Sequence, residues 1–219
     1  MPSNLKHKIT LIGSSGLIGT NFLEQIGPDD FQNVKAITRR KILNLENKDF
    51  IKQSVHDFSD LEEMRQDLKT DVLVSALGTT IKKAGSKNEF TKIDHDLTLK
   101  ISKIAKEEGC RTMILISSIG ASCESNIFYS KVKGLLEVSL KEIGFEELHI
   151  LRPSLLLGKR TETRPAEYIS KHLIGHLSFL IPWKYKPIHA SIIAKKIKFI
   201  IMEEKSGIHI WEGRKLFNI

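Results

Sequence analysis

The chain has 219 residues, which suits one domain of about 100–200 residues with a small addition. Its 41% hydrophobic and 27% charged residues are typical of a globular protein and exclude a disordered, collagenous or disulfide-scaffold chain. The net charge of +8 predicts an anionic ligand. Because the basic residues are scattered and form no recognition motif, we expect a phosphorylated small molecule rather than nucleic acid.

The sequence pattern does not indicate export or membrane insertion. Residues 1–8 are polar, the first apolar run is only Ile9–Ile12, and the longest apolar stretch, Leu173–Trp183, is interrupted by glycine, histidine and proline. A bilayer span needs about 20 apolar residues. We therefore predict a cytoplasmic protein with no membrane partner, in which Cys110 and Cys123 are reduced.

Strand-like and helix-like patterns alternate through the first two-thirds of the chain, which predicts an α/β fold with a parallel sheet covered by helices. Short apolar runs predict strands at residues 8–12, 34–38, 50–55, 71–77, 112–117, 148–151 and 208–211. Apolar residues at three-to-four spacing predict helices over residues 17–26, 61–68, 88–108, 126–143 and 191–204. We expect one domain over residues 1–219, in which the proline-rich segment 159–190 forms a lid on the substrate side.

A glycine-rich turn, Gly13-Ser14-Ser15-Gly16-Leu17-Ile18-Gly19, joins the first predicted strand to the first predicted helix. Glycines allow a tight turn and let backbone N–H groups approach a diphosphate at the positive end of a helix. In this setting the turn predicts a dinucleotide site. The alternative is a tight turn without a ligand.

Thr38-Arg39-Arg40 follow the second predicted strand, where NAD sites usually carry an acidic residue that holds the ribose 2′-hydroxyl. Two guanidinium groups can instead hold a 2′-phosphate, with roughly 1.5–3 kcal/mol from each charge-assisted hydrogen bond. We therefore predict NADP(H) rather than NAD(H). A solvated basic pair is the alternative, and it predicts equal affinity for the two cofactors.

Ser117 and Ser118 end the fifth predicted strand, and Tyr129 and Lys133 lie four residues apart near the start of the next helix. Such a pair shares one helix face, and parallel sheets bind ligands at the carboxyl ends of their strands. An ammonium about 4 Å from the phenol stabilises the phenolate by roughly 4 kcal/mol at an effective dielectric constant near 20. We predict that Ser118 hydrogen-bonds the substrate oxygen, that Tyr129 transfers its proton, and that Lys133 assists the tyrosine and holds the nicotinamide ribose. Ser117 remains the alternative serine.

These motifs, in this order, resemble the atypical NAD(P)-binding branch of the short-chain dehydrogenase/reductase superfamily. More narrowly, the chain is similar to the Tat-interactive-protein oxidoreductases at Leu77-Gly78-Thr79-Thr80, Lys83-Ala84-Gly85, Asp94-His95-Asp96, Phe128-Tyr129, Lys133-Gly134, Leu151-Arg152-Pro153 and Arg164-Pro165. The resemblance covers about residues 8–164. It implies a doubly wound Rossmann-like sheet, NADP(H) as cofactor, and Tyr129 as catalytic acid or base beside Lys133.

The resemblance also implies a set of cofactor contacts along the carboxyl edge of the sheet. They comprise the glycine turn (Gly13, Ser15, Gly16, Leu17, Ile18 and Gly19), the basic pair Arg39 and Arg40, and Asp57, Leu77, Gly78, Tyr129, Lys133, Leu156 and Arg164. The implied function is an NADP-dependent oxidoreductase acting on an unknown small carbonyl or alcohol. Since family members are described as regulatory proteins too, the alternative is an NADPH-sensing protein that binds a protein partner without turnover.

Two residue pairs have simpler interpretations. His172 and His176 lie four residues apart but have no carboxylate or cysteine at useful spacing, so we expect no metal site. Lys82 and Lys83 are interpreted as part of a solvated face.

Overall fold

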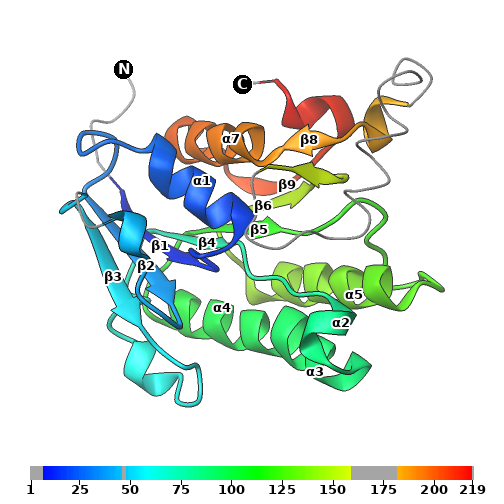
Figure 1. Cartoon of the computed structure of the whole chain (residues 1–219), viewed down its shortest axis with the longest axis horizontal. Coiled ribbons are helices and arrows are strands. Elements are labelled where there is room, and N and C mark those ends of the chain that lie inside the picture. The colour runs from blue at the N-terminus through cyan, green and yellow to red at the C-terminus, as the bar shows by residue number, and fades with distance from the viewer. Residues whose placement is uncertain (1–6, 46–47, 159–181, 219) are drawn as a thin grey trace.

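In the computed structural model, which describes residues 7–45, 48–158 and 182–218, the centre is a seven-stranded sheet whose pairings are all parallel. The strands lie in the order β3-β2-β1-β4-β5-β6-β9 (Figure 1). Their bounds are β1 (Lys8–Ile12), β2 (Asn33–Thr38), β3 (Ile51–Val55), β4 (Val72–Ser75), β5 (Thr112–Ile116), β6 (Glu147–Arg152) and β9 (Gly207–Glu212). The predicted doubly wound α/β fold is confirmed, and β1 beside β4 forms the switch point at which such sheets bind ligands.

Helices cover both faces of the sheet, as Figure 1 shows. One layer holds α1 (Leu17–Gln25) and α7 (Ala190–Glu203), which pack together. The other layer holds α2 (Ile81–Ala84), α3 (Lys87–Thr91), α4 (Thr98–Glu107) and α5 (Phe128–Ile143). The central strands β4 and β5 are buried throughout, as expected for apolar parallel strands with helices on both sides. Within the described ranges, no helix combines the length and apolar character needed to cross a bilayer.

Most of the predicted lid, residues 159–190, lies outside the described residues. Arg164, His172 and His176 are among the residues that are not described. The described part of this segment begins at Pro182 and contains a 3₁₀ turn, Trp183–Tyr185. It continues into the short strand β8 (Ile188–His189), which pairs in parallel with β7 (Leu156–Leu157) in a separate small sheet.

The helix predicted over residues 61–68 is wrong. The structure has only a 3₁₀ turn there, Glu62–Met64, and the Asp60 carboxylate accepts a hydrogen bond from the first N–H of that turn at 2.9 Å. Such local side-chain bonding competes with helix formation. Met64 and Leu68 are nonetheless fully buried, so the apolar spacing marked core positions and not a helix.

The prediction of one continuous α-helix over residues 88–108 is also wrong, because a π-helical turn divides this region into two α-helices. After α3 the chain makes a π-helical turn, Lys92–Leu97, before α4 begins. A π turn contains one more residue than an α turn and is frequent at functional sites. The fully buried Asp94 lies within this turn.

Helix α5 presses against the loop that follows β5, and Gly134 makes this approach possible. A Cβ on Gly134 would lie 2.2 Å from the carbonyl carbon of Ser122 and 2.4 Å from the nitrogen of Cys123. One turn earlier, the Ser130 carbonyl accepts the backbone N–H of Ser122 at 3.1 Å. The loop and the first turns of α5 are therefore held as one unit.

We predict that Gly134→Ala destabilises the fold by about 1–3 kcal/mol, because the new methyl group overlaps backbone atoms that cannot move aside. For a chain of this length each kcal/mol lowers Tm by roughly 2–4 °C, which thermal unfolding measures. Gly27→Ala is the matched control, since a Cβ there would meet its nearest atom, on Asp30, at 3.9 Å. Equal Tm values for the two variants would contradict the packing argument.

Candidate functional site

The glycine turn between β1 and α1 is fixed by close backbone contacts. Gly13 has φ +77°, and a Cβ there would lie 2.5 Å from the carbonyl carbon of Ala76. A Cβ on Gly19 would lie 2.4 Å from the Gly13 carbonyl oxygen. The buried Ser14 donates its hydroxyl to the Ile37 carbonyl at 2.7 Å, which ties the turn to β2. These contacts explain why the sequence needs glycine at both ends of the turn.

The amino end of α1 is open to an anion. Gly16 is the N-cap, no side chain caps the helix, and its first turn holds no acidic residue. Ser15 and Gly16 are exposed, whereas Ile18 is buried in the core. Leu17 packs at Gly158, where a Cβ would lie 2.7 Å from the Leu17 Cδ1 atom. The Gly16 N–H donates to the Gly13 carbonyl at 3.0 Å, but the helix end has no side-chain cap, so its positive end is suited to an anion such as a diphosphate.

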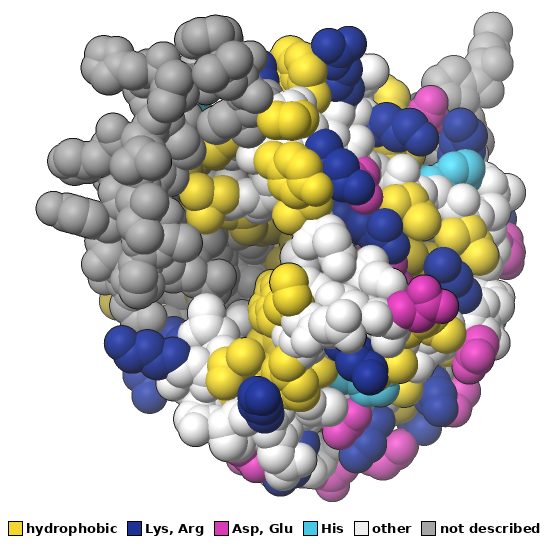
Figure 2. Space-filling model, turned by 90° about the vertical axis from the view of Figure 1, so that its right-hand side faces the viewer, with side chains coloured by type: hydrophobic (Ala, Val, Ile, Leu, Met, Phe, Trp, Pro, Cys, Tyr) yellow, Lys and Arg dark blue, Asp and Glu magenta, His cyan; other side chains and the backbone are white. Residues whose placement is uncertain are grey.

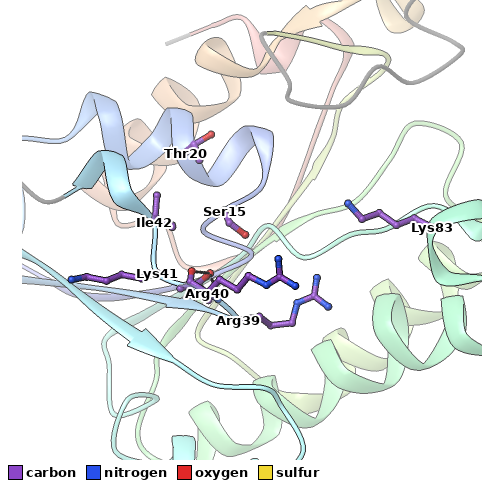
Figure 3. A pocket seen from close by; sticks show the side chains of 8 residues that line it. Ser15, Thr20, Arg39, Arg40, Lys41, Ile42 and Lys83 are labelled. Atoms are coloured by element: carbon purple, nitrogen blue, oxygen red, sulfur yellow. Dashed lines mark hydrogen bonds between the residues drawn. The ribbon is translucent and has the colours of Figure 1, made fainter.

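A basic pocket of about 600 Å³ lies beside this turn (Figure 3). It is lined by Ser15, Thr20, Thr38, Arg39, Arg40, Lys41, Ile42 and Lys83. Figure 3 shows the Arg39 and Arg40 side chains extending from the end of β2 into the pocket, with Lys83 reaching toward them from α2. Among the residues that the structure describes, four cations and no carboxylate line the pocket, so this part of it favours an anion. The interpretation of Lys83 as part of a solvated face is therefore incomplete.

A buried ion pair lies at the other end of the site. The Lys133 Nζ atom on α5 is 2.8 Å from the Asp94 Oδ1 atom, and the two side chains are 3% and 0% exposed. The other Asp94 oxygen accepts the backbone N–H of Thr79 at 2.9 Å. Burial alone lowers the pKa of Lys133, but the Asp94 carboxylate and the Tyr129 phenol outweigh it and raise that pKa above its usual value. Lys133 is therefore a fixed ammonium ion.

The end of β4 connects the glycine turn to this ion pair. Ala76 touches Gly13, as described above, and Leu77 follows it half-buried. A Cβ on Gly78 would lie 3.7 Å from the Asp94 Oδ1 atom and 3.8 Å from the Lys133 Nζ atom. Residues 76–78 thus span the distance between the glycine turn and the lysine.

The two serines at the end of β5 have different surroundings. The Ser117 hydroxyl donates to the buried carboxylate of Glu137 at 2.5 Å, and the Arg152 Nε atom donates to the same oxygen at 3.0 Å. The Ser118 hydroxyl oxygen is buried and has no hydrogen-bond partner among the described residues. The Ser117 hydroxyl is therefore used to bind α5 to the sheet. The geometry favours Ser118 as the serine available to a substrate.

Tyr129 lies one turn before Lys133 and is half-buried. Its ring centre is 5.4 Å from that of Phe90, at an interplanar angle of 41°. The adjacent Ile127 is 66% exposed. Figure 2 looks onto the side of the molecule where α5 begins, and it shows hydrophobic side chains gathered in the middle of that face with basic ones between them. The surface on this side of the molecule is thus partly apolar.

The remaining predicted contacts are less closely joined to this site. Asp57 follows β3, is solvent-exposed and is not among the residues lining the basic pocket. Hydrogen bonds from Ser59 lower the pKa of its carboxyl. Leu156 lies in β7 and packs against the apolar core on the α1 side. For Arg164 the structure gives no position.

Sequence reasoning assigned no role to Asp94, Glu137 or Lys83. Asp94 had a detectable signal, because an acidic residue within the apolar stripe of a helix must find a buried cation. Glu137 follows Lys133 by four residues and so shares its buried helix face, which is a weaker signal. Lys83 had none, since only the folded chain brings α2 to the pocket.

A family model described as HIM1 matches residues 29–186. The chain belongs to the HIM1 family. This HIM1 chain is 37% identical over 173 residues to "Protein HTATIP2" of Rattus norvegicus, covering 77% of this chain and 71% of that protein. It is 38% identical over 218 residues to "Protein FMP52, mitochondrial" of Eremothecium gossypii, covering 95% of each. The predicted resemblance to atypical short-chain dehydrogenase/reductases is confirmed.

Solved structures share the fold of this HIM1 chain at low sequence identity. The enzyme WbmG of Bordetella bronchiseptica, solved in complex with NAD, superposes with a TM-score of 0.71 at 15% identity, covering 97% of this chain and 74% of that chain. At this identity the likeness supports the Rossmann-like fold alone.

The prediction of a cytoplasmic location is wrong. The relative from Eremothecium gossypii is named mitochondrial, and so are three further fungal relatives. The prediction used the lack of an export pattern, which distinguishes secretion from retention but does not discriminate among compartments inside the cell.

We predict that Asp94→Asn lowers the free energy of unfolding at pH 7 by about 3–5 kcal/mol, because the Lys133 charge stays buried without its partner. The pKa of Lys133 is raised in the folded protein. The ion pair therefore contributes the same stability at every pH below the usual lysine pKa, and this stability is lost as the pH rises through the raised pKa of Lys133. In the variant, burial instead lowers that pKa, so the unfolded chain binds the extra proton and stability rises with pH. Denaturant unfolding between pH 7 and 10 should show the two proteins converging.

Asp96→Asn is the control for this experiment. The Asp96 side chain is 47% exposed and pairs with His95 at 2.8 Å, so its loss should cost less than about 1 kcal/mol. A gap between Asp94→Asn and the unmodified protein that stays constant over this pH range would exclude Lys133 as the responsible group.

Proposed function

We propose that this chain is an NADP(H)-dependent oxidoreductase that acts on a small carbonyl or alcohol substrate. The observation that carries the proposal is the position of residues 76–78, which touch Gly13 of the glycine turn and lie against the Lys133–Asp94 pair. A dinucleotide with its diphosphate on the turn would extend along the end of β4 toward Lys133. WbmG, which shares this fold, was solved in complex with NAD, so the fold is one that can hold a dinucleotide.

The described residues fit such a cofactor. The turn has exposed backbone at Ser15 and Gly16 and an uncapped helix end, and the neighbouring pocket presents Arg39 and Arg40. Guanidinium groups suit a 2′-phosphate because their paired N–H donors match its oxygens. When bound, the nicotinamide group supplies or accepts the hydride, which is chemistry that no side chain provides.

Side chains of the protein would transfer the proton to the substrate. In the reducing direction, the substrate carbonyl oxygen would accept a hydrogen bond from the Ser118 hydroxyl and take the Tyr129 proton, and the bound nicotinamide group would supply the hydride. The products are an alcohol and a phenolate, which solvent reprotonates. Lys133, held in place by Asp94, stabilises the phenolate electrostatically. The exposed Ile127 side chain, two residues before Tyr129, would suit a substrate with an apolar portion.

We predict that replacing both Arg39 and Arg40 by glutamine weakens NADPH binding by roughly 10- to 100-fold, as expected from losing one or two charge-assisted hydrogen bonds. Binding of NADH, which has no 2′-phosphate, should change little and serves as the internal control. Titration of intrinsic protein or nicotinamide fluorescence measures both affinities. A protein that binds NADPH and NADH equally before substitution would contradict the assigned specificity.

We predict that Tyr129→Phe abolishes turnover and leaves NADPH affinity within about twofold, because the phenol hydroxyl transfers the proton but contributes little to cofactor binding. The measurement is loss of nicotinamide absorbance in a panel of aldehydes and ketones. Turnover that survives the substitution would reject the assignment. Tight NADPH binding without turnover by the unmodified protein would instead favour a regulatory protein that senses the cofactor.

A further inference from the structure

Glu137 is a buried carboxylate of α5 that the proposed proton transfer does not use. It lies four residues after Lys133, which lies four residues after Tyr129, so the three side chains belong to the same side of the helix. The residue is only 1% exposed. A carboxylate out of contact with water lowers stability unless charged or hydrogen-bonding groups pair with it. The partners of Glu137 therefore show which parts of the chain it joins.

Two neighbouring strands supply these partners. The hydroxyl of Ser117, directly after β5, donates to the Glu137 Oε1 atom at 2.5 Å. From β6, Arg152 donates to the same oxygen through Nε at 3.0 Å and to Oε2 through Nη2 at 2.5 Å. Paired N–H donors of one guanidinium group fix the orientation of a carboxylate more strictly than a single bond does. Glu137 thereby holds α5 against the ends of β5 and β6.

The guanidinium group of Arg152 is also held from its other side. Its Nη1 atom donates to the Glu212 Oε2 atom at 3.4 Å, and the two residues are partners in the parallel pairing of β6 with β9. The other Glu212 oxygen pairs with the Lys184 Nζ atom at 2.6 Å. Arg152 therefore lies between two carboxylates, and it gives α5 a fixed point of attachment on the sheet.

The backbone around Ser118 is attached to the same strand. The N–H of Ser117 donates to the Leu151 carbonyl at 2.8 Å, and the N–H of Ile119 donates to the Pro153 carbonyl at 2.9 Å. These bonds extend the pairing of β5 with β6 beyond the last strand residue. The serine proposed to bind the substrate is thus fixed to the segment that carries the guanidinium group.

Glu137 also acts on Lys133 through its charge. Burial lowers the pKa of Lys133, whereas Asp94, Tyr129 and, more weakly, Glu137 raise it. The carboxylate one helical turn away therefore favours the ammonium form that the proposed reaction needs. Geometry and charge act in the same direction.

We propose that Glu137 is a positioning residue: its bonds to β5 and β6 set the place of Tyr129 and Lys133 relative to the end of β5. The inference rests on the proposed function, because it takes Tyr129 as the group that transfers the proton. The role assigned to Glu137 requires no contact with substrate or cofactor. Since a misplacement of about 1 Å can lower a reaction rate by roughly 100-fold, loss of these bonds acts on turnover more than on binding.

The test compares Glu137→Gln with Glu142→Gln in the full chain. Both remove one carboxylate from α5, but Glu142 is exposed and serves as the matched control. Turnover of a carbonyl compound from the aldehyde and ketone panel is expressed per NADPH-binding site, and KM and the Kd of NADPH are measured in parallel. We expect Glu137→Gln to lower kcat roughly 10- to 100-fold while KM and Kd stay within about threefold. Glu142→Gln should change none of the three.

A second control separates positioning from stability. Ile197→Ala removes a fully buried side chain from α7, in the opposite helix layer, and should lower Tm without changing kcat per NADPH-binding site. Glu137→Gln should also lower Tm, because it breaks a buried ion pair. A lower Tm with an unchanged kcat per site would show that Glu137 only stabilises the fold, and would overturn the inference.

Arg152→Lys keeps the inference testable if Glu137→Gln does not fold. It retains the positive charge but loses the paired N–H donors, so kcat should fall by a smaller factor with KM and Kd unchanged. An unchanged kcat in Arg152→Lys, a loss seen in KM or Kd instead of kcat, or an equal loss in Glu142→Gln would overturn the inference while the proposed function stands. If the unmodified chain reduces no member of the panel, the proposed function fails and the inference fails with it.

Discussion

The buried ion pair between Lys133 and Asp94 organises the site. Two charges out of contact with water are tolerated only where each has a partner, so this pair fixes α5 against the π-helical turn that contains Asp94. The same carboxylate also binds the Thr79 N–H and so fixes the segment after β4. One carboxylate thereby holds three separate parts of the chain at the carboxyl edge of the sheet.

The glycine turn and the ion pair depend on each other through the end of β4. Ala76 and Leu77 lie so close to Gly13 that no larger residue fits there, and Gly78 lies beside Asp94 and Lys133. A cofactor along this edge would touch rigid backbone at both ends. Such preorganisation favours binding of a long ligand because little of the protein has to be ordered when the ligand enters.

The cluster of Ser117, Glu137 and Arg152 explains why the adjacent serines Ser117 and Ser118 have different surroundings. Neighbouring residues at the end of a strand point to opposite faces, and the Glu137 carboxylate takes the hydroxyl that points toward α5. The hydroxyl of Ser118 is left without a partner among the described residues. The choice follows from the packing of α5 on the sheet and cannot be read from the Ser-Ser pair itself.

The alternation of apolar runs and the glycine turn were sufficient to predict the α/β class and the order of the strands along the chain, because they reflect local periodicity and backbone requirements. Local pattern failed where long-range contacts decided the outcome. The π turn around Asp94 replaced part of a regular helix, and residues 61–68 supplied core positions without a helix. The approach of Lys83 to Arg39 and Arg40 joins residues more than forty positions apart, so only tertiary folding could bring these charges together.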